Sequence, residues 1–266
     1  MIVDYHVHLR NEHEEIAHDA DSVEPFVEAA HDAGVDEVGF TEHAYYFTQL
    51  RTLWSVAYQV ERCVYDLDAY VDAVLQARDR GLPVKLGLEL DYVPGREDET
   101  RALLAPYPWD YLLGSVHYVD GLGIDSAPRL ADEVGVEEMW RRYFDLLARA
   151  AHSGLVDSLS HPDLAKVFGD RVELDYTDIS DAIAQSGVAV EVSTAGLHKP
   201  VGELYPSPDF LAACRERKVP VTTGSDAHAP SLVGRDFDRS RQLLRSAGYE
   251  TVTVFDRREA RQEPLG

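Results

Sequence analysis

Short apolar segments of strand length alternate along the chain with segments that have the hydrophobic spacing of helices. The predicted strands are Met1–His8, Val35–His43, Val84–Tyr92, Tyr111–His117, Val156–His161, Val188–Ser193 and Val219–Asp226. The predicted helices are Ser22–Ala33 with Ser22 as N-cap, Asp66–Arg80, Val136–Ser153, Tyr176–Ser186, Pro208–Arg217 and Asp238–Ala247. Alternation of this kind indicates parallel strands joined by right-handed crossovers. No linker interrupts it, so we expect one α/β domain over residues 1–266, with a strand count close to that of a closed barrel.

Each predicted strand ends in residues that can bind a metal ion. In a strand, alternate side chains share a face, so His6 and His8 can reach the same ion. In a barrel, all these strand ends meet on one face. The candidates are Asp4, His6, His8, Glu42, His43, Glu89, Asp91, His117, His161, Asp163, Glu191, Asp226 and His228. Imidazoles and carboxylates without cysteine suit zinc, iron or manganese rather than a structural zinc site, and Glu89 is placed to bridge two ions.

Individually, these residues also have less specific explanations. A single histidine at a strand end is more often solvated than bound to metal. A lone Glu42 or Glu191 would more often orient a neighbouring imidazole than bind an ion. Asp4 and Asp91 allow either role. The remaining histidines are His31 and His152 in predicted helices, and His13 and His18 in the first loop, of which only one need be a ligand.

Composition limits the partners and the compartment. The formal net charge of −23 argues against a nucleic-acid-binding surface, which needs basic residues. A small anionic substrate remains compatible, because bound cations reverse the local field. No apolar run reaches the roughly 20 residues of a membrane span, and no signal peptide is expected. Cys63 and Cys214 indicate no disulfide framework, so we expect a cytoplasmic protein.

Two longer segments follow strand ends, where barrel loops build an active site. They are Ala44–Tyr65, which is rich in aromatic residues, and Tyr118–Gly135. The aromatic stretch Tyr45–Tyr58 has two interpretations, a lid over a substrate or ordinary loop packing.

Several motifs resemble the polymerase-and-histidinol-phosphatase (PHP) family, and in particular its histidinol-phosphatase branch. They are Gly87-Leu-Glu-Leu-Asp-Tyr92, Gly114-Ser-Val-His117, His161-Pro-Asp-Leu164, and Thr194-Ala-Gly-Leu-His-Lys-Pro200 followed by Tyr205-Pro-Ser207. The resemblance covers nearly the whole chain and implies a distorted seven-stranded (β/α)7 TIM-like barrel.

The resemblance also implies a site with three divalent ions, which could be zinc, iron or manganese. The first ion would be held by His6, His8, Glu89 and Asp226, the second by Glu89, His117 and His161, and the third by His18, His43 and His228. We expect His18 rather than His13 in this set because its spacing to the first predicted helix fits the family better.

The implied reaction is hydrolysis of a phosphomonoester by a metal-bound hydroxide, with Glu89 and Asp226 as catalytic residues. A bridging water or Asp226 would protonate the leaving group. The implied substrate is L-histidinol phosphate, which would give L-histidinol and phosphate in histidine biosynthesis. His198 stands where the branch often has a phosphate-binding arginine. A histidine can still donate one hydrogen bond to phosphate but lacks the bidentate guanidinium, for which Lys199 or Arg235 could compensate.

Three alternatives differ in class. The nearest is a PHP phosphoesterase acting on a nucleotide or sugar phosphate. An amidohydrolase-type barrel also begins with His-x-His, but Lys85, Lys166, Lys199 and Lys218 do not lie at a suitable strand end to bridge its metals. A non-enzymatic metal-binding domain is disfavoured by candidate ligands at all seven strand ends. The oligomeric state cannot be predicted from the sequence.

Overall fold

The computed structural model describes residues 1–9 and 18–266, so His13 lies outside the described residues. Its main strands form two parallel sheets, which confirms the predicted parallel α/β architecture. One sheet has the order β1-β2-β3 and the other the order β10-β9-β8-β5-β4. The strand bounds are β1 Val3–Val7, β2 Glu37–Phe40, β3 Val84–Leu86, β4 Glu89–Asp91, β5 Leu113–Ser115, β8 Ser158–Leu159, β9 Ala189–Ser193 and β10 Val221–Gly224.

The two sheets approach each other along both edges. The predicted strand Val84–Tyr92 is divided into β3 in one sheet and β4 in the other. Between them, Gly87 has no room for a side chain, because a Cβ atom there would lie 2.7 Å from Cζ of Tyr111. Isolated parallel bridges join His43 to Glu89 and Val7 to Ala227. Backbone pairing therefore continues between the sheets beyond their regular strands.

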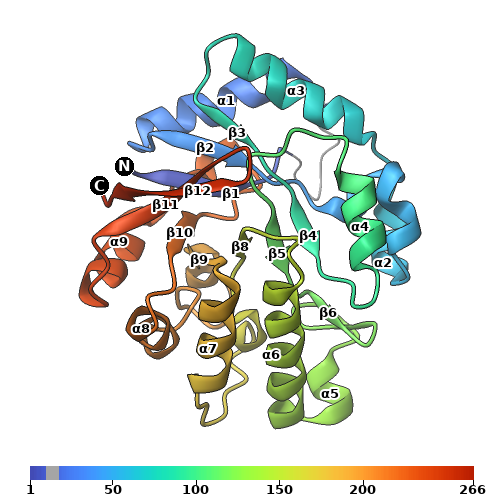
Figure 1. The fold of residues 1–266 in the computed structure, drawn as a ribbon, viewed down its shortest axis with the longest axis vertical. Helices are drawn as coiled ribbons and strands as arrows, with labels where there is room; N and C mark the ends of the chain where they lie inside the picture. The colour runs from blue at the N-terminus through green and yellow to red at the C-terminus, as the bar shows by residue number, and fades with distance from the viewer. Residues whose placement is uncertain (10–17) are drawn as a thin grey trace.

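Helices surround the strands (Figure 1). The six predicted helices are present as α1 Ala20–Asp32, α3 Leu67–Asp79, α6 Val136–His152, α7 Thr177–Ser186, α8 Pro208–Glu216 and α9 Phe237–Ser246. Helix α1 begins earlier than predicted, because Asp19 and not Ser22 is the N-cap. The Asp19 carboxylate accepts the backbone N–H of Ser22 at 2.8 Å. Val23, Phe26 and Ala30 of this helix are buried, with the spacing of a core-facing stripe.

The two long loop segments contain short elements that were not predicted. Residues 44–65 form the 3₁₀ turns η1 Ala44–Tyr46 and η2 Thr48–Leu53 and the helix α2 Ala57–Arg62. Tyr46 and Phe47 are fully buried there in the main core, which favours the packing interpretation of this aromatic stretch. The other short elements are α4 Glu97–Leu104, β6 Tyr118–Val119, β7 Leu122–Gly123 and α5 Leu130–Val134.

A hairpin of β11 Thr251–Asp256 and β12 Glu259–Pro264 ends the described chain. Its turn residues Arg257 and Arg258 have φ values of 49° and 67°, a conformation that normally favours Gly or Asn. The usual hairpin signal is therefore missing from the sequence. Phe255 packs with Tyr5 and Tyr111, which ties the hairpin to the first strand.

The chain ends lie side by side, as Figure 1 shows, and the N–H of Gly266 donates to the carbonyl of Met1 at 3.1 Å. In the described part of the chain, no helix combines the length and the apolar character that crossing a membrane requires.

Candidate metal centre

The histidines and carboxylates at the ends of the parallel strands gather into one buried cluster. His6 lies in β1 and Glu89 begins β4, whereas His117 and Asp226 each follow their strand by two residues. His6 and His8 are fully buried, and Glu89 is 2% exposed. The strands therefore hold the cluster on rigid backbone, as parallel sheets do for sites at their carboxyl ends.

Glu89 is the centre of the cluster. Five imidazoles of the described chain have a ring nitrogen within 3.8 Å of its carboxylate. They belong to His43 at 2.5 Å, His161 at 3.1 Å, His6 at 3.5 Å, His117 at 3.6 Å and His8 at 3.8 Å. The Ser115 hydroxyl also donates to Glu89 Oε1 at 2.6 Å. The two oxygens face different imidazoles, which is the arrangement a bridging carboxylate needs.

Asp226 is the second shared carboxylate. Its Oδ1 atom lies 3.4 Å from Nε2 of His8, 3.6 Å from Nε2 of His6 and 3.6 Å from Nδ1 of His228. Its backbone has φ 54°, a left-handed conformation that few residues other than Gly, Asn and Asp adopt. The turn aims this side chain back at the histidines of β1.

Asp4 holds this turn in place. It is fully buried and accepts hydrogen bonds from the backbone N–H of Ser225 at 2.8 Å, from its hydroxyl at 2.5 Å and from the N–H of Gly234 at 2.8 Å. Burial raises the pKa of Asp4 to about 6, although these hydrogen bonds oppose the rise. Asp4 therefore supports the residue next to Asp226.

Within residues 1–9 and 18–266, three sets of potential ligand atoms lie close enough to share an ion, each set within 4.8 Å. They are His6 with Glu89 and His161, His6 with His8 and Asp226, and His8 with His43 and His228. His117 borders the first set through Glu89. His18 is in none of them. Its Nε2 atom lies instead 3.8 Å from Oε1 of Glu42, whose other oxygen is 3.6 Å from Nδ1 of His8.

Other carboxylates orient the imidazoles from behind. Glu191 Oε1 lies 2.8 Å from Nδ1 of His6, and Asp91 Oδ1 lies 2.7 Å from Nδ1 of His117. An ionised carboxylate only accepts hydrogen bonds, so each Nδ1 must donate, and the lone pair of Nε2 can face the centre. Glu191 Oε2 also accepts the backbone N–H of His161 at 2.7 Å.

Electrostatics keep the two central carboxylates charged. Burial acts to raise the pKa of Glu89, but the imidazoles of His43, His6 and His117 outweigh it and hold the pKa well below its usual range. The pKa of Asp226 is likewise held well below its usual range, against the effect of burial, by His6 and His8. Negative charge in a buried cluster of nitrogen donors favours a divalent cation.

The donor set fits such ions. Nε2 of His6 is buried and makes no hydrogen bond to any described residue, although Glu89 and Asp226 are only 3.5 and 3.6 Å away. A buried polar atom without a partner is costly, and an ion between these groups would satisfy it. Imidazole and carboxylate ligands without thiolates are typical of zinc, iron and manganese in catalytic sites.

The predicted phosphate-binding side chains lie outside the buried cluster. His198 is 42% exposed, and its Nε2 atom lies 2.7 Å from Oδ2 of Asp236. Lys199 is exposed, and Arg235 is half-buried. The Nε atom of Arg235 is buried and has no hydrogen-bond partner among the described residues.

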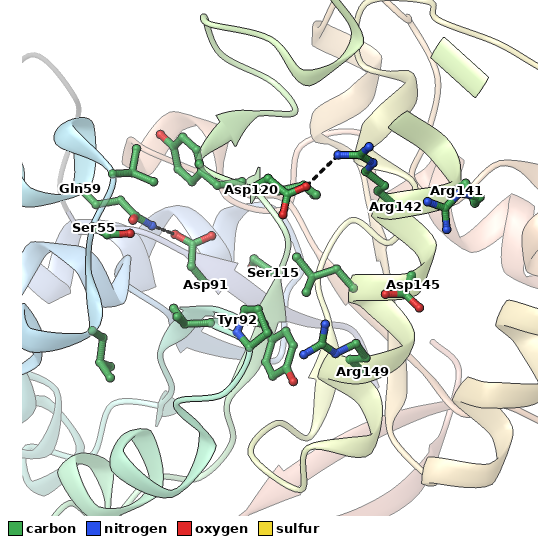
Figure 2. A pocket seen from close by; sticks show the side chains of 18 residues that line it. Ser55, Gln59, Asp91, Tyr92, Ser115, Asp120, Arg141, Arg142, Asp145 and Arg149 are labelled. Atoms are coloured by element: carbon green, nitrogen blue, oxygen red, sulfur yellow. Dashed lines mark hydrogen bonds and ion pairs between the residues drawn. The ribbon is translucent and has the colours of Figure 1, made fainter. Parts of the chain in front are cut away.

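A cavity of about 530 Å³ lies beside the cluster. Asp91 and Ser115 line this cavity and also hydrogen-bond to His117 and Glu89 of the cluster. Figure 2 shows Gln59 and Asp91 facing each other on one side of the cavity and Arg141, Arg142 and Arg149 on the other. Gln59 was not singled out from the sequence. It lies in a short helix inside the aromatic segment, and neither spacing nor a motif marks it.

Comparisons with known proteins show which family this chain resembles over most of its length. The model of the PHP domain family matches residues 4–195. The probable histidinol-phosphatase of Deinococcus radiodurans is 37% identical over 237 residues, which cover 88% of this chain and 90% of that protein. The histidinol-phosphatase of Bacillus subtilis is 26% identical over 254 residues, which cover 82% of this chain and 91% of that protein.

A similar fold occurs in the crystal structure of histidinol phosphate phosphatase from Lactococcus lactis, which contains zinc, L-histidinol and phosphate. It is 20% identical, has a TM-score of 0.75 and covers 98% of each chain. The family model spans most of this chain, and the Deinococcus relative is similar over nearly all of it. The chain belongs to the PHP domain family.

Proposed function

We propose that this protein is a metal-dependent phosphatase that hydrolyses L-histidinol phosphate to L-histidinol and phosphate, a reaction of histidine biosynthesis. The observation that carries the proposal is the buried Glu89 carboxylate within 3.8 Å of five imidazole nitrogens. The substrate is supported by the names of the Deinococcus and Bacillus relatives and by the ligands of the Lactococcus structure.

The proposed centre holds up to three divalent ions, zinc, iron or manganese. The first would be bound by His6, His8, Glu89 and Asp226, the second by Glu89, His117 and His161, and the third by His43, His228 and His18. His18 is the ligand with least geometric support, because it faces Glu42, whereas His8 lies with His43 and His228. Bound ions would activate water and neutralise charge that develops on the phosphoryl group.

The protein's own residues then have distinct tasks. Glu89 would join two ion positions, and Glu191 and Asp91 would fix the imidazoles of His6 and His117. Asp226 is held ionised by its histidine neighbours, so it suits ligation and proton acceptance better than proton donation. Of the two proton sources considered for the leaving alkoxide, this favours a water molecule.

Three side chains near the site are proposed to contact the substrate phosphate. His198 could donate a hydrogen bond to phosphate from a ring nitrogen, but its Nε2 already pairs with the carboxylate of Asp236. Lys199 and Arg235 would therefore supply most of the positive charge, and Arg235 is favoured because its buried Nε has no partner among the described residues. Replacing Arg235 by Met should raise KM more than it lowers kcat if the guanidinium serves mainly to bind substrate.

We further propose that the two sheets close into a distorted seven-stranded barrel, in which β3 and β4 count as one strand. The bridges of Val7 with Ala227 and of His43 with Glu89 support closure at both sheet edges. The packing of Phe255 against Tyr5 supports a single domain. The buried free thiols of Cys63 and Cys214 support a reducing, cytoplasmic setting.

The test is a steady-state assay of the metal-loaded protein against L-histidinol phosphate and a panel of nucleotide and sugar phosphates. We expect kcat/KM to be highest for L-histidinol phosphate, by at least about tenfold. Equal values across the panel would refute the specific substrate and leave a broader phosphoesterase. Absence of hydrolysis for every ester, with metal bound, would refute the phosphatase itself.

A further inference from the structure

We propose that Gln59 is a positioning residue of the metal centre, because its side-chain amide fixes the Asp91 carboxylate that orients His117. This inference rests on the proposed function, in which His117 is a metal ligand. It assigns a residue of the aromatic segment at residues 44–65 to the support of His117, which follows β5.

The three side chains form a continuous hydrogen-bonded chain. Gln59 Nε2 donates to Asp91 Oδ2 at 2.9 Å, and His117 Nδ1 donates to Asp91 Oδ1 at 2.7 Å. The backbone N–H of His117 approaches the same Oδ1 atom at 3.4 Å. Gln59 and Asp91 are 4% and 6% exposed, so water replaces these hydrogen bonds poorly.

The direction of each hydrogen bond is fixed by chemistry. The carboxylate can only accept, so the Gln59 amide must donate to one oxygen and Nδ1 of His117 to the other. With Nδ1 of His117 donating to Asp91, the lone pair of Nε2 faces Glu89, whose Oε1 lies 3.6 Å away. The orientation of Asp91 therefore sets the orientation of the nitrogen that would bind an ion.

Asp91 is buried, but it also lines the cavity beside the cluster. The cavity has a volume of about 530 Å³, and cationic side chains lie across it (Figure 2). Arg142 there already pairs with Asp120 at 2.9 Å. The Gln59 amide binds Oδ2 of Asp91, so it opposes any rotation of the carboxylate that would take Oδ1 away from His117.

The inference is tested by a double-mutant cycle with Zn²⁺ as the probe. Zn²⁺ is titrated, in competition with a chromophoric chelator, into four metal-free proteins. These are the unchanged protein, Gln59→Leu, Asp91→Ala and the double variant. His117→Ala identifies the ion that depends on His117. Gln49→Leu is the matched control, since Gln49 lies in the same segment and donates to a different carboxylate, Asp66, at 2.5 Å.

We expect Asp91→Ala to weaken the His117-dependent ion about 10- to 100-fold and Gln59→Leu to weaken it roughly tenfold. In the Asp91→Ala background, Gln59→Leu should add nothing, because the amide acts through the carboxylate. Gln49→Leu should bind Zn²⁺ like the unchanged protein. If Gln59→Leu does not fold, Gln59→Glu keeps the size but repels Asp91, and should weaken the same ion at least as much.

Two results would overturn the role of Gln59 and leave the proposed metal centre intact. One is unchanged Zn²⁺ affinity in Gln59→Leu while His117→Ala loses an ion. The other is an equal loss from Gln59→Leu with and without Asp91, which is what a general packing defect gives. If His117→Ala binds as many ions as the unchanged protein, the proposed metal centre itself fails, and this inference fails with it.

Discussion

Glu191 provides a sharp test of how the protein controls its imidazoles. The side chain is 1% exposed, and each oxygen has one donor, Nδ1 of His6 at 2.8 Å and the backbone N–H of His161 at 2.7 Å. Replacing it by Gln keeps the shape and turns one acceptor into an NH₂ donor. No orientation of the amide can then satisfy both neighbours while Nδ1 of His6 keeps its proton.

Each rotamer has a definite cost. If the NH₂ group faces the N–H of His161, two buried donors oppose each other. If it faces His6, Nδ1 must become the acceptor and the proton moves to Nε2, which then has no lone pair for an ion. A hydrogen bond to a charged group contributes about 1.5–3 kcal/mol, which corresponds to roughly 10- to 100-fold in affinity.

We therefore expect Glu191→Gln to bind Zn²⁺ about 10- to 100-fold more weakly in chelator competition. Its metal-free form should lose about 1–3 kcal/mol of unfolding free energy in urea. Glu250→Gln is the control, because Glu250 is exposed, and it should leave both quantities unchanged. Unchanged Zn²⁺ affinity and unchanged stability in Glu191→Gln would refute the reasoning.

Three further outcomes follow from the structure. Glu89→Gln should abolish turnover and lower the number of bound ions measured by elemental analysis, and full activity would contradict its bridging role. Gly224→Ala should destabilise the fold by about 1–3 kcal/mol in urea unfolding and weaken Zn²⁺ binding, because its Cβ would lie 1.9 Å from Oε1 of Glu191. Arg258→Ala removes the 2.6 Å ion pair with Asp157, whose pKa is raised by burial although Arg258 lowers it. Without Arg258, the pKa of Asp157 should rise further, because burial disfavours the ionised carboxylate and no cation opposes it. The loss of unfolding free energy in Arg258→Ala should therefore be larger at pH 7, where the carboxylate is ionised in the unfolded chain, than at pH 4. A loss that does not change with pH would contradict this role for Asp157.

The sequence predicted the larger elements because their signals are local. Alternating apolar segments and helix stop signals place the strands and helices within a few residues, and the N-cap of α1 shifted only from Ser22 to Asp19. The hairpin at the end of the described chain was missed, because Arg257 and Arg258 occupy a turn that normally carries Gly or Asn. The division into β3 and β4 was missed too, and at the division Gly87 lies against Tyr111, a residue distant in sequence that precedes β5.

The candidate site divides in a similar way. Which residue types stand at the strand ends is a property of the sequence, and the structure gathers most of them around Glu89. Their individual partners depend on contacts between distant segments, such as Glu191 with His6 and Gln59 with Asp91. His18 shows this most clearly, because the family resemblance implied a place beside His43, whereas Nε2 of its ring lies 3.8 Å from Oε1 of Glu42.

The sequence by itself therefore determined the parallel α/β architecture and the set of histidines and carboxylates available at one end of it. Strand periodicity and the parallel crossover rule are sufficient for that, because both act over short stretches of chain. Only the tertiary structure decided which nitrogen of His6 and of His117 faces the centre. That choice is made by the buried carboxylates Glu191 and Asp91 from other strands, whose hydrogen bonds persist because these side chains are shielded from water.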